Sequence, residues 1–279
     1  MSNSFQSIAI VARRNDPHVT EPMQVLSDHL RKAGIKLLAD DATRDADLII
    51  AIGGDGTILY ASSLARDTGT PILGINRGRL GFLADVTPAE MIDSVDHVLR
   101  GDYTTDSRLM LEARLRASSG EEITAVALND VVLQRSETGR MVDFETRISG
   151  RYVNTHSGDG LIVATPTGST AYALSCGGPI IEPQLDALVV VPVCPHTLTD
   201  RPIVISAQQT IEIRLIERDD TKAEITVDGF SMGSIRPDDR LHICAANHRV
   251  TLVHPPGYDF YGILRSKLFW GRDNRNRDT

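Results

Sequence analysis

The chain has 279 residues, of which 41% are hydrophobic and 24% charged, and its formal net charge is −8. This composition is that of an ordinary globular protein, and the negative charge argues against a nucleic-acid partner. No apolar run approaches the roughly 20 residues that a membrane-spanning helix needs, so no membrane partner is expected.

The N-terminal segment and the cysteines indicate a cytoplasmic protein. Residues 1–6 lack the charged and then apolar order of a signal peptide. Cys176, Cys194 and Cys244 are far apart and include no C-x-x-C pair, which argues against a metal site or a disulfide. We therefore expect three buried free thiols and a reducing compartment.

Strand and helix signals alternate over the first hundred residues. Thr87, Pro88 and Glu90 are typical of a capping box that opens a helix. The alternation predicts a parallel α/β sheet (Rossmann-like), with ligand sites at the carboxyl ends of its strands. The expected strands are 7–11, 35–38, 48–52 and 71–75, and the expected helices are 21–33 and 57–66.

The pattern changes after Gly101. Apolar and polar residues alternate over 109–115 and in later segments, residues 118–121 are typical of a hairpin turn, and one helix is expected near 170–176. Residues 101–254 are therefore predicted to form a mostly β C-terminal domain. Helical spacing over 260–268 predicts a last helix that packs back on the N-terminal domain (1–100 with 255–279), because an isolated short helix is marginal in water.

Residues 53–57, Gly-Gly-Asp-Gly-Thr, form a turn between an expected strand and an expected helix. Glycines let a phosphate approach the backbone, where successive N–H groups and a helix start attract an anion. A carboxylate beside phosphates is unfavourable unless it binds a cation or accepts a proton, and a phosphotransferase needs both functions. Asp55 is therefore a candidate general base. The alternative is that Asp55 only caps the helix.

Two polar residues, Asn129 and Asp130, interrupt an apolar run over 125–133. A carboxylate and an amide at a sheet edge are suited to the vicinal hydroxyls of a ribose. The alternative is an Asn-Asp turn between two short strands, which these two residues by themselves favour.

Asp159 lies between two glycines, and hydroxyl residues gather before the helix expected near 170–176. The segment 165–170 contains four of them, which is more than one cap requires and favours an anion site at the helix start. Tyr172 is equally suited to stack on a flat ring and to pack inside the protein.

Several other motifs are absent from the sequence. It contains no P-loop, no G-x-G-x-x-G and no H-E-x-x-H motif. The eight histidines show no metal-ligand spacing, and His156, His196 and His254 are interpreted as structural.

Together and in this order, these segments resemble the NAD kinase family, whose members phosphorylate the 2′-hydroxyl of the adenosine ribose of NAD to give NADP. The turn 53–57 alone is also similar to turns of diacylglycerol kinases, sphingosine kinases and phosphofructokinases, whereas its combination with 129–130 and 159–172 is specific. Further similar stretches occur within 74–83, 177–180 and 195–202, so the resemblance covers about residues 8–270.

The resemblance implies a role for each segment. The N-terminal domain would bind the phosphate donor, and the C-terminal domain would bind NAD, partly with residues of a neighbouring subunit. Asp55 would be the catalytic base. The residues implied to seat the ATP phosphates are Gly53, Gly54, Gly56 and Thr57; those implied to bind NAD are Asp55, Gly56, Asn129, Asp130, Arg140, Asp159, Thr170, Ala171, Tyr172, Ala173, Leu174 and Ser175.

The resemblance also implies ATP as donor, a divalent metal (magnesium) and a homotetramer or dimer. Ser157 stands where members that use polyphosphate tend to have glycine, which favours ATP. The sequence shows no protein ligands for the metal. Three positions depart from the common family pattern: Tyr60 replaces a basic residue, Asp130 a glutamate and Phe230 a glutamine.

Two other functions are consistent with the same motifs. A non-catalytic nucleotide sensor would keep the pocket but is expected to lose the base, whereas Asp55 is present. A lipid kinase on the same scaffold is expected to carry an apolar groove or a basic amphipathic segment, neither of which is evident in the sequence.

Overall fold

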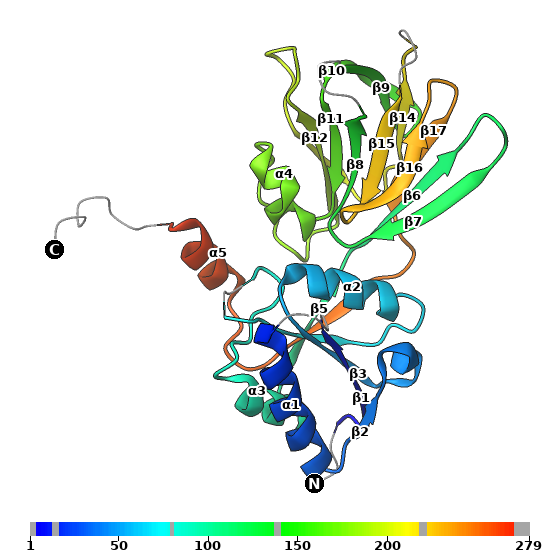
Figure 1. Cartoon of the computed structure of the whole chain (residues 1–279). Coiled ribbons are helices and arrows are strands. Elements are labelled where there is room, and N and C mark those ends of the chain that lie inside the picture. Colours follow the sequence, from blue (N-terminus) through cyan, green and yellow to red (C-terminus); the bar gives the residue numbers. More distant parts are fainter. Residues whose placement is uncertain (1–3, 13–16, 79–80, 137–140, 218–221, 271–279) are drawn as a thin grey trace. The chain divides into compact units, whose positions relative to one another are not determined.

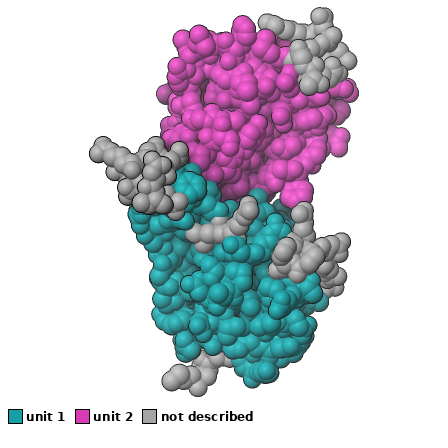
Figure 2. Space-filling model, turned by 60° about the vertical axis from the view of Figure 1, so that its left-hand side comes forward, with its two compact units in different colours: residues 1–106, 250–279 teal, residues 107–249 magenta. Residues whose placement is uncertain are grey.

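The computed structural model describes residues 4–12, 17–78, 81–136, 141–217 and 222–270 (Figure 1). The chain forms two compact units, coloured separately in Figure 2: unit 1 comprises residues 1–106 and 250–279, and unit 2 comprises residues 107–249. The sequence predicts domain boundaries after residues 100 and 254. The boundaries of the two units differ by a few residues, because β5 (Thr104–Arg108) and β18 (Val250–His254) belong to the sheet of unit 1. The roles expected of the two domains stay a prediction.

A six-stranded sheet with the order β2-β1-β3-β4-β18-β5 forms the framework of unit 1. The pairs from β2 to β18 are parallel, as the alternation of strands and helices predicts. Its strands are β1 (Ser7–Ala12), β2 (Lys36–Leu38), β3 (Leu48–Ile52), β4 (Ile72–Ile75), β5 (Thr104–Arg108) and β18 (Val250–His254). Its helices are α1 (Pro17–Lys32), the 3-10 helix η1 (Asp40–Asp45), α2 (Asp55–Ala65), α3 (Met91–Leu99) and α5 (Phe260–Leu268).

The core of unit 1 lies between this sheet and its helices. All five residues of β3 are buried, which is typical of a strand inside a parallel sheet whose faces are covered. Leu26 and Leu30 of α1 and Val95 of α3 belong to the same buried cluster as Leu48 and Ile50. The carboxyl end of β3 is therefore held rigidly where the turn 53–57 begins.

The helix expected to open at Thr87 begins instead at Met91. The Glu90 N–H donates to the Thr87 C=O at 3.1 Å, and the Thr87 hydroxyl donates to the Glu90 carboxylate at 2.6 Å. These bonds close a separate turn, so the expected capping box is wrong. The last helix, α5, belongs to unit 1 as predicted, with Ile263 and Leu264 buried.

Two antiparallel six-stranded sheets form unit 2, as the two-residue alternation predicts. The first has the order β10-β9-β14-β17-β6-β7 and the second β13-β12-β11-β8-β15-β16. The strands are β6 (Leu111–Arg116), β7 (Glu122–Ala127), β8 (Asp130–Arg135), β9 (Val142–Ile148), β10 (Arg151–Gly158), β11 (Gly160–Ala164), β12 (Ala187–Val193), β13 (Ile203–Ser206), β14 (Ile211–Leu215), β15 (Ala223–Val227), β16 (Phe230–Ile235) and β17 (Arg240–Ala245).

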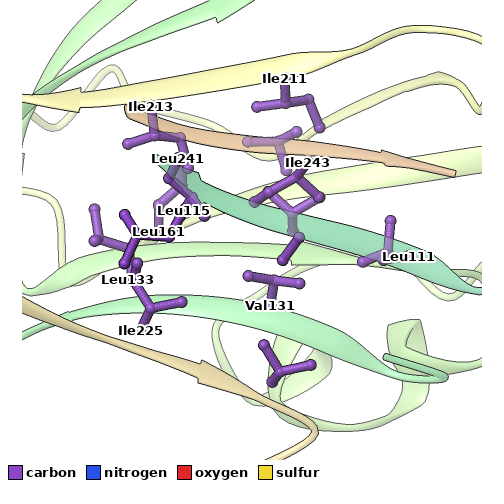
Figure 3. Packing of buried hydrophobic residues seen from close by; sticks show 14 of the residues in the cluster. Leu111, Leu115, Val131, Leu133, Leu161, Ile211, Ile213, Ile225, Leu241 and Ile243 are labelled. Atoms are coloured by element: carbon purple, nitrogen blue, oxygen red, sulfur yellow. The ribbon is translucent and has the colours of Figure 1, made fainter. Parts of the chain in front are cut away.

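Side chains from both sheets of unit 2 share one buried core (Figure 3). Leu111 and Ile243 come from the first sheet, and Val131, Leu161 and Ile225 from the second. Each fully buried side chain of this size contributes roughly 1.5–3 kcal/mol through the hydrophobic effect. Because β7 and β8 lie in different sheets, the chain crosses between the sheets at residues 128–129.

The helix expected near 170–176 is shorter than predicted. The 3-10 turn η2 (Gly168–Thr170) precedes α4, which comprises only Tyr172–Ser175. Ala173 is fully buried and packs with Val132 and Ile162 of the second sheet. Among the described residues, no helix is both long and apolar enough to cross a membrane.

The cysteines are free thiols, but their expected burial is wrong. Cys194 is exposed, and Cys176 and Cys244 are only partly buried. Cys194 follows the last residue of β12 with a φ of 43°, so it lies in a turn that leaves the sheet.

Candidate active site

Asp55 is the first residue of α2 and follows the turn at the carboxyl end of β3. Gly54, which precedes the helix, has an extended backbone, and among the described residues no side-chain hydrogen bond caps α2. The alternative that Asp55 serves only as the cap is therefore wrong. Its side chain points instead to the loop that follows β4.

Three successive N–H groups hold the Asp55 carboxylate. The Phe82 N–H donates to Oδ2 at 3.0 Å, and the N–H groups of Leu83 and Ala84 donate to Oδ1 at 3.1 and 3.4 Å. Each oxygen of a carboxylate can accept about two hydrogen bonds. Among the described residues, Oδ2 accepts one hydrogen bond, which leaves one acceptor direction for a further hydroxyl.

Gly81 is required by this contact. A Cβ at position 81 would overlap Asp55 Oδ1, so glycine lets the backbone of 81–84 wrap closely around the carboxylate. The Gly81 N–H donates to the Ala84 C=O at 3.1 Å and closes the turn. Asp55 is thus fixed in one orientation while its side chain stays partly exposed.

The expected phosphate seat is the start of α2. The Gly53 N–H donates to the Ile75 C=O and the Thr57 N–H to the Gly54 C=O, both at 2.8 Å, so these two groups already have acceptors. The first N–H groups of a helix have no acceptor within the helix and attract anions. Gly54 and Gly56 are therefore placed to offer N–H groups, whereas Gly53 and Thr57 shape the turn.

A second carboxylate, that of Asp228, holds the crossing between β7 and β8 in unit 2. The Leu128 N–H donates to Oδ2 at 2.7 Å, and the N–H groups of Asn129 and Asp130 donate to Oδ1 at 2.8 and 3.1 Å. Asp228 and Gly229 have φ values of 49° and 82° in the two-residue turn between β15 and β16. Asp-Gly favours such a type I′ turn, which aims the Asp228 carboxylate at the crossing.

The carbonyl groups of the same crossing, residues 128–129, accept hydrogen bonds from Thr165. The Thr165 hydroxyl donates to the Leu128 C=O at 2.6 Å, and the Thr165 N–H donates to the Asn129 C=O at 2.9 Å. A Cβ at Gly168 would overlap that Asn129 oxygen. The backbone of Asn129 and Asp130 is thus held at a break between two strands. Their expected role in binding a ribose stays a prediction.

The Asp130 side chain is buried at this crossing, and Asn129 is partly buried. Asn129 Oδ1 is buried and has no hydrogen-bond partner among the described residues, which is costly unless a donor reaches it. Burial, and then the negative charge of Asp228, raise the pKa of Asp130 to about 7. Near neutral pH, Asp130 is therefore present both as an acceptor-only carboxylate and as an acid that can also donate.

Burial also raises the pKa of Asp228, although the three N–H groups that it accepts oppose this shift. Burial and mutual repulsion thus favour a state in which Asp130 and Asp228 together retain a proton. A like-charged pair of this kind is a common feature of functional sites.

Asp159 is not brought together with Asn129 and Asp130 within one chain. Asp130 and Arg135 are the two ends of β8, roughly 17 Å apart for a strand of this length. Asp159 pairs with Arg135 at 3.0 Å, and the Arg135 N–H donates to the Asp159 C=O at 2.9 Å. The structure therefore places Asp159 and Asp130 at opposite ends of the strand.

The hydroxyls of 165–170 have structural roles. Besides Thr165, the Ser169 hydroxyl donates to the Pro166 C=O at 2.6 Å and the Thr170 hydroxyl to the Thr167 C=O at 3.1 Å. Arg108 Nη1 donates to Thr167 Oγ1 at 3.4 Å. The hydroxyls of Thr165, Ser169 and Thr170 therefore satisfy backbone carbonyls of the protein. The anion site expected here stays a prediction.

The side chains of residues 170–175 differ in their exposure to solvent. Ala173 is buried in the core, and its expected contact with NAD stays a prediction. Tyr172 is 40% exposed, and Ser175 is exposed as well, whereas Thr170, Ala171 and Leu174 are partly buried. Burial, and more weakly the Cys176 thiol, raise the pKa of the Tyr172 phenol. Arg140 lies outside the described residues.

Comparisons with known proteins identify the family. A model of the ATP-NAD kinase N-terminal domain matches residues 13–103, and a model of the ATP-NAD kinase C-terminal domain matches residues 128–255. The chain is 40% identical to the NAD kinase of Nitrosococcus oceani, with 98% of this chain and 99% of that protein covered. It is 41% identical to the NAD kinase of Acinetobacter baylyi, with 98% and 94% covered.

The chain belongs to the NAD kinase family.

It is accordingly an enzyme, a phosphotransferase. Among solved structures, its fold is similar to that of yeast NADH kinase complexed with NADH, with a TM-score of 0.90, 22% identity and coverage of 99% of this chain and 94% of that one. An NAD kinase from Archaeoglobus fulgidus in complex with ATP gives a TM-score of 0.74 at 24% identity, covering 94% and 97%. These likenesses confirm the fold class predicted from the sequence: an α/β N-terminal domain, a mostly β C-terminal domain and a last helix that returns to the first.

Three features of the site were not singled out by the sequence. Asp228 has a local signal, because Asp-Gly between two alternating segments indicates a hairpin turn. The N–H groups of 82–84 have no local sequence signal, because every residue except proline carries a backbone N–H group. Arg135 is one of many surface arginines, and only the pairing of β8 with β11 reveals its contact with Asp159.

Proposed function

We propose that this NAD kinase family member transfers the γ-phosphoryl group of ATP to the 2′-hydroxyl of the adenosine ribose of NAD, giving NADP and ADP. The observation that carries the proposal is the setting of Asp55: a partly exposed carboxylate beside a helix start, with one oxygen that keeps an open acceptor direction. Family membership supplies the phosphotransfer chemistry.

In the proposed step, Asp55 Oδ2 accepts the proton of the 2′-hydroxyl while that oxygen bonds to the γ-phosphorus. The bond between the γ-phosphorus and the bridging oxygen to the β-phosphate breaks, and ADP leaves with that oxygen. Such general-base help contributes about 10²- to 10⁴-fold to a rate. The N–H groups of 82–84 keep the carboxylate aimed, and the N–H groups at the start of α2 attract the phosphates.

The proposal divides the functions between the two units. Unit 1 provides the base and the phosphate seat, and unit 2 provides Asn129 and Asp130 as partners for ribose hydroxyls. Tyr172, because it is exposed, is suited to stack on a flat ring of NAD. Asp159, which lies at the other end of β8, is proposed to serve the NAD site of a neighbouring subunit in a cytoplasmic homotetramer or dimer.

Magnesium is proposed to reach the site on the ATP phosphates. Among the described residues, no three His, Cys, Asp or Glu side chains are grouped to hold a metal ion. The side chains thus do not form a protein cage, and the usual alternative for Mg²⁺ is binding through substrate phosphates and water.

A coupled assay of NADP formation tests the proposal. Purified full-length protein with NAD, MgCl₂ and ATP is expected to form NADP, and replacement of ATP by polyphosphate is expected to give less product. Calorimetry with NAD in the absence of a donor serves as the companion measurement. Tight NAD binding without turnover by any nucleoside triphosphate or polyphosphate would contradict the proposal and favour a sensor.

A further inference from the structure

His254, the last residue of β18, lies between two carboxylates of unit 1. Its Nδ1 is hydrogen-bonded to Asp85 Oδ2 at 2.8 Å, whereas its Nε2 lies 3.4 Å from Asp106 Oδ2, at the distance of an ion pair but without hydrogen-bond geometry. The His254 side chain is 2% exposed and each aspartate side chain 10%. The ring also stacks on Tyr258, with ring centroids 3.7 Å apart and planes 14° apart. One imidazole therefore contacts β5, the loop after β4 and the segment that leads to α5.

The arrangement fits a protonated ring. A neutral imidazole carries one N–H and can serve only one of the two carboxylates, whereas an imidazolium carries two. Burial by itself lowers the pKa of His254, but the attraction of the Asp106 and Asp85 carboxylates outweighs it, and the net pKa is raised above 6.5. A stacked cation is also attracted by the face of a tyrosine ring.

The carboxylate that His254 contacts adjoins the loop that holds the candidate base. Asp85 directly follows residues 82–84, whose N–H groups donate to Asp55. A shift of the Asp85 side chain therefore pulls on the peptide units that carry those donors. The same loop contacts α5, because Lys267 Nζ lies 5.8 Å from the centroid of the Phe82 ring.

A cavity of about 530 Å³ adjoins this cluster and is lined by further titratable side chains. Asp85 and Tyr258 line it together with acidic residues of the α3 region and of the segment before α5. The titratable side chains that line it are Asp85, Glu90, Asp93, His97, Tyr258 and Asp259. His97 is itself paired with Asp102 at 2.7 Å, and most of the titratable side chains that line this cavity are acidic.

We propose that His254 is a positioning residue for Asp55: its ring, bridging Asp85 and Asp106, fixes the loop 81–85 so that the backbone N–H groups of 82–84 orient the Asp55 carboxylate. The catalytic consequence rests on the proposed function, since it requires Asp55 to be the base. The structural consequence does not, because protection of the three N–H groups can be measured without substrate or turnover.

Amide hydrogen exchange on the full-length protein tests the structural consequence. His254→Phe keeps a ring on Tyr258 but loses both contacts with carboxylates, and His254→Asn keeps a donor near the position of Nδ1 that can still reach Asp85. We expect H254F to lose at least tenfold in the protection factors of 82–84 and H254N to retain most of the protection. Unchanged protection in H254F would overturn the proposal.

His156 provides the matched control. It is a buried histidine of unit 2 that pairs with Asp200 at 2.9 Å and stacks on Phe144. H156F removes a similar buried pair, and we expect it to leave the protection of 82–84 unchanged. Equal loss in H156F and H254F would mean that the effect is general destabilisation, and this would also overturn the proposal.

Steady-state kinetics test the catalytic consequence. We expect kcat of H254F to fall roughly 10- to 100-fold, as for a misplaced catalytic group, with the Kd for NAD changed less than threefold. H254N should recover most of kcat. A fall in NAD affinity with unchanged kcat would contradict a positioning role, whereas absence of NADP formation by the wild-type protein would contradict only the proposed function.

The wild-type protein offers a test that does not depend on the folding of a variant. Because the pKa of His254 is raised in the folded state, the ion pairs are complete below the unfolded value of about 6.5 and are lost as the pH rises through the folded pKa. Protection factors of 82–84, corrected for intrinsic exchange, should fall over that interval, while those of Ile49 and Ile50 in β3 stay constant. A parallel change in all of these amides would overturn the proposal.

Discussion

Asp55 in unit 1 and Asp228 in unit 2 each accept three successive backbone N–H groups, from 82–84 and from 128–130 respectively. In unit 1 the carboxylate that accepts them is itself the candidate base. In unit 2 the accepting carboxylate is separate from Asn129 and Asp130, whose side chains are the predicted partners of a ribose. We call each carboxylate together with its three N–H donors a clamp. The Asp55 clamp orients the candidate base, and the Asp228 clamp holds the backbone of 128–130, where Asn129 and Asp130 are predicted to bind NAD.

The difference is also electrostatic. Asp55 has no second carboxylate in its clamp and stays partly exposed. Asp130 is 6% exposed beside Asp228, and its pKa is raised to about 7. We therefore expect acceptance of the 2′-hydroxyl proton to depend on the Asp55 clamp. We expect the pH dependence of NAD binding to depend on the Asp228 clamp, which holds Asp130.

The largest expected effect follows replacement of Asp55. Asp55→Asn keeps the size of the side chain but removes the base and presents an NH₂ group to the N–H donors of 82–84. We expect kcat for NADP formation to fall about 10²- to 10⁴-fold, with circular dichroism and the Kd for NAD little changed. A kcat within threefold of wild type would remove Asp55 from its proposed role.

A smaller effect on stability is expected for Asp228. Asp228→Asn tolerates the left-handed turn but weakens hydrogen bonds to a charged acceptor, so the free energy of unfolding should fall by about 2 kcal/mol and the Kd for NAD should rise. Asp239 is the matched control, because its carboxylate accepts the N–H groups of Ser118 and Arg236 at 2.8 Å. Asp239→Asn should lose similar stability in urea unfolding without weaker NAD binding; equal weakening would refute the specific role of Asp228.

Two glycines that pack closely against these segments, Gly81 and Gly168, allow a paired test. Gly81→Ala places a methyl group against Asp55 Oδ1, and Gly168→Ala places one against the Asn129 carbonyl oxygen. Overpacking typically costs about 1–3 kcal/mol. We expect G81A to lower kcat more than NAD affinity and G168A to do the reverse. The comparison fails if both variants lose the same parameter.

The smallest expected effect concerns the pH dependence of stability. Because the pKa of Asp130 is raised in the folded state, folding favours its protonated form, and this contribution is complete below the unfolded value of about 3.9 and is lost as the pH rises to about 7. Asp130→Asn should therefore gain stability relative to wild type by about 1 kcal/mol between pH 6 and pH 7. Thermal unfolding at these two pH values measures the difference, and a constant difference would contradict the raised pKa.

The sequence by itself determined the alternation of strands and helices in unit 1, the two-residue pattern of unit 2 and the turn at 53–57. These features are local: the periodicity of apolar residues reflects the face that each element buries, and glycines mark the turns. The capping box at Thr87 was wrong, and three of the four hydroxyls at 165–170 donate to backbone carbonyls. Hydroxyl residues look the same in a sequence whether they bind a ligand or satisfy their own turn.

Only the tertiary structure decided which groups hold Asp55 and Asn129, and that Asp159 lies at the far end of β8 from Asp130. Residues 55 and 82–84, or 128–130 and 228, meet because strands distant in the chain pair within one sheet. Their contacts are made by backbone N–H groups, which every residue except proline possesses. Residue identity therefore carries no record of them, and the position of each donor follows from the fold alone.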